Sequence, residues 1–226
     1  MQILDKHNTE SEPVIFVVDD DAAIRDSLRL LLESMDRKVE TYESAQDFLN
    51  NANRNLPGCI ILDVRMPGIS GLELQDKLNE MHTDLPVIFI TGHGEIPMAV
   101  NTMRKGAFDF IQKPFSASGL VERIDKALQL NHEIRDQRHV QHDLEELFAA
   151  LTHRELEVLD LIVEGKSNKY IAYELELSQR TIEAHRSHIM EKLHVKSLAE
   201  LVRLVVSYKT HQEKSESDSL ASEPVH

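Results

Sequence analysis

The sequence predicts a doubly wound α/β domain with a five-stranded parallel sheet, then a helical linker and an all-α domain of four helices. Short apolar runs rich in Val and Ile recur along the first half, as in strands that are buried on both faces of a parallel sheet. Amphipathic helical patterns separate these runs, which is typical of repeated β–α units. After residue 151 the strand signal disappears and four helical patterns remain. The expected strands lie near residues 14–18, 38–42, 58–62, 86–90 and 107–111.

Polar residues stand at the ends of four of these runs. Asp residues 19–21 follow the first run, Asp63 the third, Thr91 the fourth and Lys113 the fifth. Because ligands of open parallel sheets bind beyond the carboxyl ends of the strands, we expect these side chains to share one crevice. Carboxylates, a hydroxyl and an ammonium group in one crevice suit the binding of a divalent cation and a phosphoryl group.

The carboxylates are candidate ligands for Mg²⁺ or Mn²⁺, which prefer oxygen ligands. Asp20 and Asp63 are expected to bind the ion directly, and Asp19 to lie beside it or reach it through water. The backbone carbonyl of Arg65 is expected to supply a further oxygen. With the ion in place, the Asp63 carboxylate can attack a phosphorus atom as a nucleophile.

The phosphorylated product carries extra negative charge, for which Lys113 supplies a cation and Thr91 a hydroxyl. The Lys113–Pro114 bond is a candidate cis peptide. Each residue also has a plainer interpretation: Asp residues 19–21 can start a helix, Asp63 can belong to a turn, and Lys113 can be a solvated lysine. Their conjunction at four strand ends favours the phosphoryl site.

Four strings carry a family resemblance: Val-Val-Asp-Asp at 17–20, Leu-Asp-Val-Arg-Met-Pro at 62–67, Ile-Thr-Gly-His-Gly at 90–94 and Gly-Ala-Phe-Asp-Phe-Ile-Gln-Lys-Pro-Phe at 106–115. On the basis of these four strings, residues 14–128 resemble the receiver domain of bacterial two-component response regulators.

The resemblance implies that Asp63 accepts a phosphoryl group from a sensor histidine kinase. It also implies that Asp19, Asp20 and Asp63 form the metal site and that Lys113 binds the phosphoryl group. Thr91 and Phe110 would form a switch pair, and the face formed by the fourth helix and fifth strand would dimerise. That last implication places Val100 and Arg104 on the dimer face.

The second domain shows a helix-turn-helix pattern. Thr152 and Glu155 form a candidate capping box for a helix over 152–164 that ends at Gly165. A short helix over 166–177 and a tight turn then lead into a helix from Ser178 or Gln179 to about Leu193, which can lie in a DNA major groove. Ile182, Ile189 and Leu193 are expected to face inward.

The candidate DNA contacts fall into two groups. Lys169 and Lys192 are placed to meet phosphates. The more exposed positions expected on the second helix are Arg180, Thr181, Glu183, Ala184, Arg186 and Ser187. His185 and His188 stand three residues apart, but no Cys or acidic residue stands at ligand spacing, which argues against a metal site there.

By pattern alone the helical domain is also compatible with a protein-interaction module. Its strings at 151–159, 165–172 and 178–185 resemble the LuxR-type DNA-binding domain over residues 147–208. Together with the run Thr-Gly-His-Gly-Glu-Ile-Pro-Met-Ala-Val at 91–100, the chain is similar to the FixJ subfamily of the NarL/FixJ response regulators.

Composition fits this interpretation. The net charge of −14 is acidic for a DNA-binding protein, but the acidity lies in the first domain and the flanks, and residues 151–211 carry no net charge. No apolar run approaches membrane-spanning length and no secretory signal is apparent, so we expect a cytoplasmic protein without membrane contact. The single cysteine, Cys59, is expected to be a small core residue.

The expected domains are a flexible N-terminus (1–12), a receiver (13–128), a helical linker (129–147), a helix-turn-helix domain (148–210) and a disordered tail (211–226). The expected function is transcription regulation: phosphorylation promotes homodimerisation and binding to double-stranded promoter DNA, with RNA polymerase as a further partner. Two alternatives are considered. A phosphohydrolase would need a second acid where Arg65 stands, so we expect no enzyme beyond self-phosphorylation and slow self-dephosphorylation. A phosphate sink or docking module would not need the helix-turn-helix.

Overall fold

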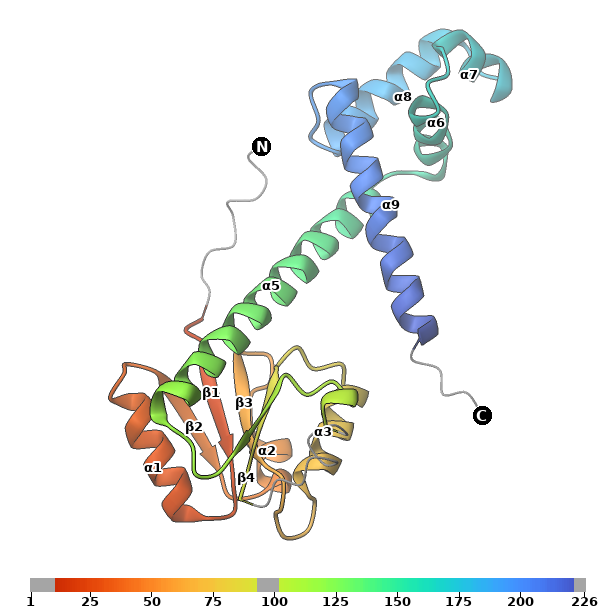
Figure 1. Cartoon of the computed structure of the whole chain (residues 1–226). Helices are drawn as coiled ribbons and strands as arrows, with labels where there is room; N and C mark the ends of the chain where they lie inside the picture. Colours follow the sequence, from red (N-terminus) through yellow and green to blue (C-terminus); the bar gives the residue numbers. More distant parts are fainter. Residues whose placement is uncertain (1–10, 93–101, 222–226) are drawn as a thin grey trace. The chain divides into compact units, whose positions relative to one another are not determined.

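The computed structural model describes residues 11–92 and 102–221, and the chain divides into two compact units, Met1–Asp136 and Gln137–His226. The first unit is built around a sheet, and the described part of the second is helical (Figure 1). Within the described ranges, no helix is both long enough and apolar enough to cross a membrane.

The first unit contains a five-stranded parallel sheet in the order β2-β1-β3-β4-β5, as the sequence predicts. Its strands are β1 (Val14–Val18), β2 (Lys38–Tyr42), β3 (Gly58–Asp63), β4 (Val87–Thr91) and β5 (Asp109–Gln112). In this order the chain reverses its direction of winding between β1 and β3. A doubly wound fold places its ligand site at such a switch point.

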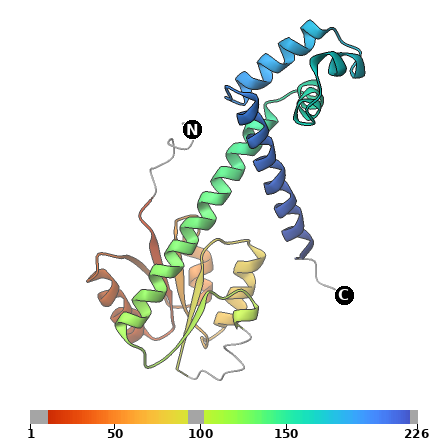
Figure 2. The same cartoon turned by 45° about the horizontal axis from the view of Figure 1, so that its top comes forward.

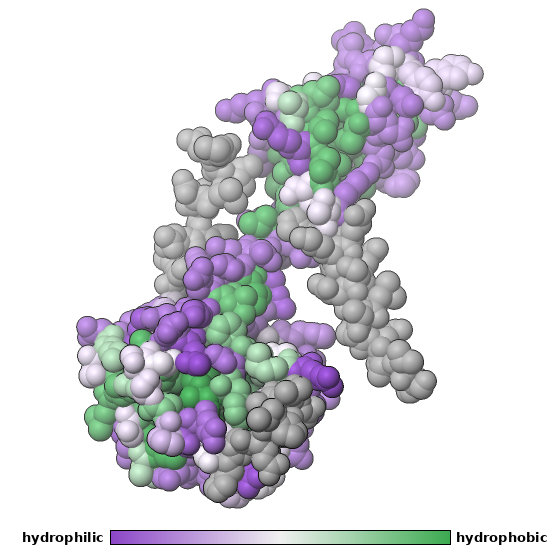
Figure 3. All heavy atoms as spheres, viewed as in Figure 1, coloured by the Kyte–Doolittle hydropathy of each residue, from purple (hydrophilic) through white to green (hydrophobic). Residues whose placement is uncertain are grey.

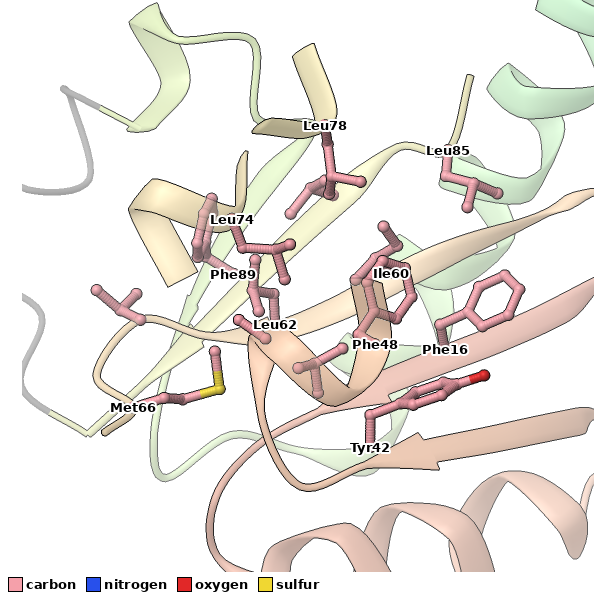
Figure 4. Close-up of a cluster of buried hydrophobic side chains, with 14 of the residues drawn as sticks. Phe16, Tyr42, Phe48, Ile60, Leu62, Met66, Leu74, Leu78, Leu85 and Phe89 are labelled. Carbon is pink, nitrogen blue, oxygen red and sulfur yellow. The ribbon is translucent and has the colours of Figure 1, made fainter. Parts of the chain in front are cut away.

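Side chains alternate across the sheet and form two cores. On one face, Phe16, Ile60 and Phe89 pack with α2 (Ala45–Asn51) and α3 (Gly71–Glu80), as Figure 4 shows. On the other face the buried residues come from the intervening strand positions and from two helices, α1 (Ala22–Glu33) and α5 (Ala117–Ala149). Cys59 is fully buried in this second core, and burial raises the pKa of its thiol to about 12, as expected for a core residue rather than a nucleophile.

Local sequence explains where the helices of the first unit begin. Asp21, Ser44 and Ser70 are the N-cap residues of α1, α2 and α3, and each side chain accepts a backbone N–H of the first turn. Gly71 allows α3 to begin directly against the end of β3. A Cβ at Gly71 would lie 2.1 Å from the carbonyl oxygen of Asp63, so only glycine fits there.

The helix α5 is continuous from Ala117 to Ala149 and therefore joins the last receiver helix and the expected linker (129–147) without a break (Figure 1 and Figure 2). Buried Asn131 belongs to the first unit, although the sequence places it in the linker. Its side chain accepts the Gly58 N–H at 2.8 Å and donates to the Asp84 carbonyl at 2.8 Å. Two hydrogen bonds thus anchor this part of α5 to the sheet.

The second unit contains α6 (His153–Val163), α7 (Asn168–Glu174), α8 (Gln179–Lys192) and α9 (Leu198–Ala221). The end of α5 also joins its core. Phe148 stacks on Tyr208 of α9 with ring centroids 3.9 Å apart, and Leu144 and Leu151 are buried nearby in sequence. The end of α5 is therefore part of this core.

The tail differs from the expectation of disorder after residue 210, because α9 continues to Ala221. Residues 211–221 contain no glycine or proline, so local sequence does not stop a helix that the core has already started.

Figure 3 shows an apolar area among hydrophilic residues on the second unit, and α9 exposes the large apolar side chains of Leu198 and Val206.

Candidate phosphorylation site and nucleic-acid interface

The strand-end residues converge as the sequence predicts. Asp63 ends β3, Thr91 ends β4, and Asp19 and Lys113 come directly after β1 and β5. The Lys113 ammonium donates to Asp19 Oδ2 at 3.0 Å and to Asp63 Oδ1 at 3.1 Å. The Lys113–Pro114 peptide is cis, as predicted. One cation therefore bridges two carboxylates that are far apart in the sequence.

Both carboxylates are largely removed from water, with Asp19 4% exposed and Asp63 9% exposed. Burial raises the pKa of Asp63, and the charge of Asp19 raises it further, whereas hydrogen bonds from Lys113 and from the Arg65 N–H lower it without cancelling the increase. For Lys113, burial lowers the pKa but the two carboxylates raise it above its usual value overall. The crevice therefore holds more negative than positive charge.

Asp19 is held by its neighbours at three of its oxygen atoms. Besides the contact with Lys113, its Oδ1 accepts the Asp21 N–H at 2.9 Å and its carbonyl accepts from Arg25 Nη1 at 2.7 Å. Asp63 is held in a similar way, because its Oδ2 accepts the Arg65 N–H at 2.7 Å. Asp20, by contrast, has an exposed side chain.

The donor set fits a hard divalent cation, because two buried carboxylates share one ammonium and an exposed carboxylate, Asp20, adjoins them. In the described conformation, however, these carboxylates are not grouped as metal ligands. Among residues 11–92 and 102–221 no three His, Cys, Asp or Glu side chains are grouped so that they could hold a metal ion. In the described part of the chain, Asp19, Asp20 and Asp63 therefore do not form a three-carboxylate group.

The predicted switch residues lie on the neighbouring strands β4 and β5. Thr91 is 2% exposed at the end of β4, and Phe110 is half-buried beside Phe89, its partner in the β4–β5 register. Of the two predicted dimer-face residues, Arg104 is exposed. Val100 lies outside the described residues.

The second unit contains the predicted helix-turn-helix. Ser178 caps α8 by accepting the Thr181 N–H, and the turn between α7 and α8 contains Glu176 with a left-handed φ of 53°. The α7 and α8 helices pack through buried Ile171, Ile182 and Ile189. The predicted inward positions of α8, including Leu193, are all fully buried.

The outward side of α8 carries most of the predicted DNA contacts. Arg180, Glu183, Ala184 and Ser187 are exposed, and Thr181 and Arg186 are partly exposed. Lys169 on α7 is also exposed. His185 and His188 belong to no group of potential metal ligands within the described part of the chain.

Lys192, the second predicted phosphate contact, forms an ion pair within the second unit. Its ammonium donates to Glu155 Oε2 at 2.7 Å, and the Glu155 side chain is only 5% exposed. The same oxygen accepts the N–H and the hydroxyl of Thr152, which completes the predicted capping box of α6. Burial alone would raise the pKa of Glu155, but the hydrogen bonds from Lys192 and Thr152 together lower it to about 2.

Comparison with known proteins agrees with both parts. Residues 15–125 match the family model for the response regulator receiver domain, and residues 149–205 match the model for bacterial regulatory proteins of the luxR family. The transcriptional regulatory protein TdiR of Thauera aromatica is 43% identical over 90% of this chain and 89% of its own length. This chain is a LuxR-type response regulator.

Two further similarities place it near FixJ. The transcriptional regulatory protein FixJ of Bradyrhizobium diazoefficiens is 41% identical over 85% of this response regulator and 94% of its own length. The solved structure of the response regulator StyR is 47% identical, covers 88% of this chain and all of StyR, and superposes with a TM-score of 0.84. This response regulator is accordingly a two-component transcriptional regulator with a receiver and a LuxR-type helix-turn-helix.

Sequence reasoning missed three residues of the response regulator that have clear structural roles. Arg25 holds the Asp19 carbonyl, Asn131 anchors α5, and Phe148 stacks on Tyr208. Each acts on a partner outside its own local pattern. The one available signal was the spacing of Leu144, Phe148 and Leu151, which is typical of apolar residues on one helix face.

Proposed function

We propose that Asp63 is the phosphoacceptor of this response regulator and that its phosphorylation promotes homodimerisation and promoter binding. The observation that supports it best is the bridge from Lys113 to both Asp19 and Asp63 at the carboxyl edge of the sheet. A buried carboxylate with a cation beside it is a nucleophile whose product already has a counter-charge in place.

In the proposed reaction an oxygen of Asp63 attacks the phosphorus of the donor. A new O–P bond forms, the bond to the donor's leaving group breaks, and its electron pair stays with the leaving group. Receiver domains generally use Mg²⁺ for this step, and bound Mg²⁺ would offset the charge of the phosphoryl oxygens. Asp20, Asp63 and the Arg65 carbonyl are the proposed direct ligands, with Asp19 adjacent. Mn²⁺ is a chemically similar substitute.

In the proposed signal, the Lys113 ammonium and the Thr91 hydroxyl respond to the phosphoryl group. Once Asp63 carries a phosphoryl group, the Lys113 ammonium faces a more highly charged acceptor, and the Thr91 hydroxyl gains an acceptor in the crevice. Movement of Thr91 toward the phosphoryl group leaves space into which half-buried Phe110 can pack. The proposed result is a changed surface beside β5 that includes Arg104 and dimerises.

Dimerisation matters because a single DNA-binding unit has few cations to offer. Residues 151–211 have no net charge, and Lys192 is already paired with Glu155. Lys169 and Arg180 are the proposed phosphate contacts, and Thr181, Glu183, Ala184, Arg186 and Ser187 are proposed to face the bases. Two units together double the phosphate contacts that hold the protein on a two-fold related site.

The proposed partners are a sensor histidine kinase as phosphoryl donor, double-stranded promoter DNA and RNA polymerase. The cytoplasm, where promoters and polymerase are found, is the proposed location. A phosphate sink would share the crevice chemistry but would not need a LuxR-type domain.

Intact-mass spectrometry tests the phosphoacceptor. Incubation with a small phosphodonor and Mg²⁺ should add one phosphoryl group to the wild type and to Asp26→Asn, a matched exposed carboxylate on α1. Asp63→Asn should take up none, and EDTA should block the wild type. Stoichiometric phosphorylation of Asp63→Asn would show that another residue is the acceptor.

A further inference from the structure

A polar cluster in the first unit joins α3 to the end of the segment before β5. Three side chains of α3, Gln75, Asp76 and Asn79, all bind Lys105. We call these four residues the Lys105 clamp. None of them belongs to the phosphoryl crevice, and none lies on the DNA-binding unit.

The clamp binds both ends of Lys105. The carbonyl of Lys105 accepts from Asn79 Nδ2 at 2.8 Å and from Gln75 Nε2 at 3.3 Å. Its ammonium contacts both oxygens of Asp76, at 2.7 and 2.9 Å. Residues 102–104 form a helical turn that Gly106 ends with a φ of 89°. The Lys105 carbonyl is therefore one of the acceptors left open at a helix end, and α3 caps it.

One hydrogen-bond acceptor of the clamp has no donor among the described residues. Gln75 is only 1% exposed, and its Oε1 has no hydrogen-bond donor among the described residues. An unmet buried acceptor is unfavourable, and the 3.3 Å contact of its amide nitrogen is a long hydrogen bond. The arrangement thus combines favourable contacts at Asp76 and Asn79 with an unfavourable one at Gln75.

The position of the clamp connects it with switching. Lys105 follows Arg104, which belongs to the proposed dimer face, and β5 begins four residues later with Asp109. All the clamp contacts are formed while Asp63 is unmodified. We infer that the Lys105 clamp stabilises the unphosphorylated conformation of this response regulator and sets how much of the protein is dimer-competent before phosphorylation. The inference rests on the proposed dimerisation through this face.

Substitutions in the clamp should shift the resting equilibrium in opposite directions. Asp76→Ala and Asn79→Ala each remove a favourable contact of the resting conformation. Gln75→Leu removes the unmet acceptor and keeps a side chain of similar size, so it should favour the resting conformation. Glu80→Ala is the matched control, because it also removes an exposed carboxylate at the end of α3 but makes no contact with Lys105 among those described.

Sedimentation equilibrium of the full chain measures the effect, with and without a small phosphodonor and Mg²⁺. Without phosphodonor, Asp76→Ala and Asn79→Ala should each lower the dimer dissociation constant about two- to fivefold, the range of exposed polar contacts. Gln75→Leu should raise it about fivefold, since it removes a buried unmet acceptor from the resting conformation. Glu80→Ala should match the wild type, and intact mass should show equal phosphoryl uptake by all variants.

Two outcomes separate the inference from the proposed function. A wild type that stays monomeric when phosphorylated overturns dimerisation, and the clamp inference with it. A wild type that dimerises normally, with clamp variants that do not shift the resting constant, overturns the clamp alone. A shift of Gln75→Leu in the same direction as Asn79→Ala also overturns it, because general loosening would move both variants alike.

Discussion

The ion pair between Lys192 and Glu155 allows a quantitative prediction for Lys192→Met. Methionine keeps the length and most of the apolar contact of the lysine side chain but removes the ammonium. The Glu155 carboxylate, 5% exposed, would then lose one of its three donors. The variant tests whether this pair, and not a phosphate contact, is the main task of Lys192.

The expected loss of stability follows from how far the Lys192 and Glu155 side chains are buried. A hydrogen bond to a charged group contributes about 1.5–3 kcal/mol. The Lys192 side chain is 35% exposed, so water can replace part of what Glu155 loses, and the lower half of that range applies. We expect about 1.5–2 kcal/mol of lost stability in the second unit, equal to roughly a 10- to 30-fold change in an unfolding equilibrium.

Hydrogen exchange of the full chain, followed by mass spectrometry, locates the effect. Peptides from α6 and α8 should lose about 10- to 30-fold in protection at neutral pH, while receiver peptides stay unchanged. Lys169→Met is the matched control, since Lys169 is an exposed lysine of the same unit. Equal protection in Lys192→Met and Lys169→Met would refute the reasoning.

The Lys192–Glu155 pair also predicts how the stability of the second unit depends on pH in acid. Because the pKa of Glu155 is lowered to about 2 in the folded protein from 4.5, its contribution to stability is fully present above about pH 4.5. The contribution is lost as the pH falls from 4.5 toward 2. Lys192→Met raises the folded-state pKa toward 4.5 or above, so the loss of α6 protection between pH 4.5 and 2 should be smaller than in the wild type. An identical pH profile for both proteins would contradict the assigned cause of the shift.

Three further predictions concern the crevice, the DNA surface and the core. Lys113→Ala should still accept a phosphoryl group by intact mass but should fail to dimerise in sedimentation, and normal dimerisation would contradict its coupling role. Lys169→Ala should weaken binding to all DNA sequences alike in anisotropy titrations, whereas Glu183→Ala should mainly change base preference; equal losses on specific and random DNA for Glu183→Ala would show that α8 is not the reading helix. Phe148→Ala should destabilise the second unit by about 3–5 kcal/mol in urea denaturation, because it removes the ring stacked on Tyr208. A cost below about 1 kcal/mol would show that α5 is not part of that core.

The features predicted best were those specified by local sequence. The strands β1, β3 and β4 could be recognised because each is a short apolar run, and their polar ends meet because parallel strands align their carboxyl edges. The same holds for the α6 cap, since Thr152 and Glu155 interact across a single turn. The sequence alone therefore predicts that Asp19, Asp63 and Lys113 lie together.

The features predicted least well depend on partners distant in sequence. Lys192 looks like a free surface cation in its own helix, and only the fold brings it to Glu155, 37 residues away. The Lys105 clamp joins residues about 30 apart and has no motif. The polar composition of the tail predicts disorder, and composition alone does not show that α9 continues into it.

The central claim is that phosphorylation at Asp63 turns a weak DNA-binding unit into a dimeric one, and the salt dependence of DNA binding tests it most directly. With Lys192 paired internally, Lys169 and Arg180 alone would neutralise two phosphates per protomer. The slope of log K against log salt should then be about −3.6 for the phosphorylated dimer and about half that for the unphosphorylated protein. Asp63→Asn should keep the shallower slope with phosphodonor and Mg²⁺ present. Equal slopes for the wild type with and without phosphorylation would contradict the claim.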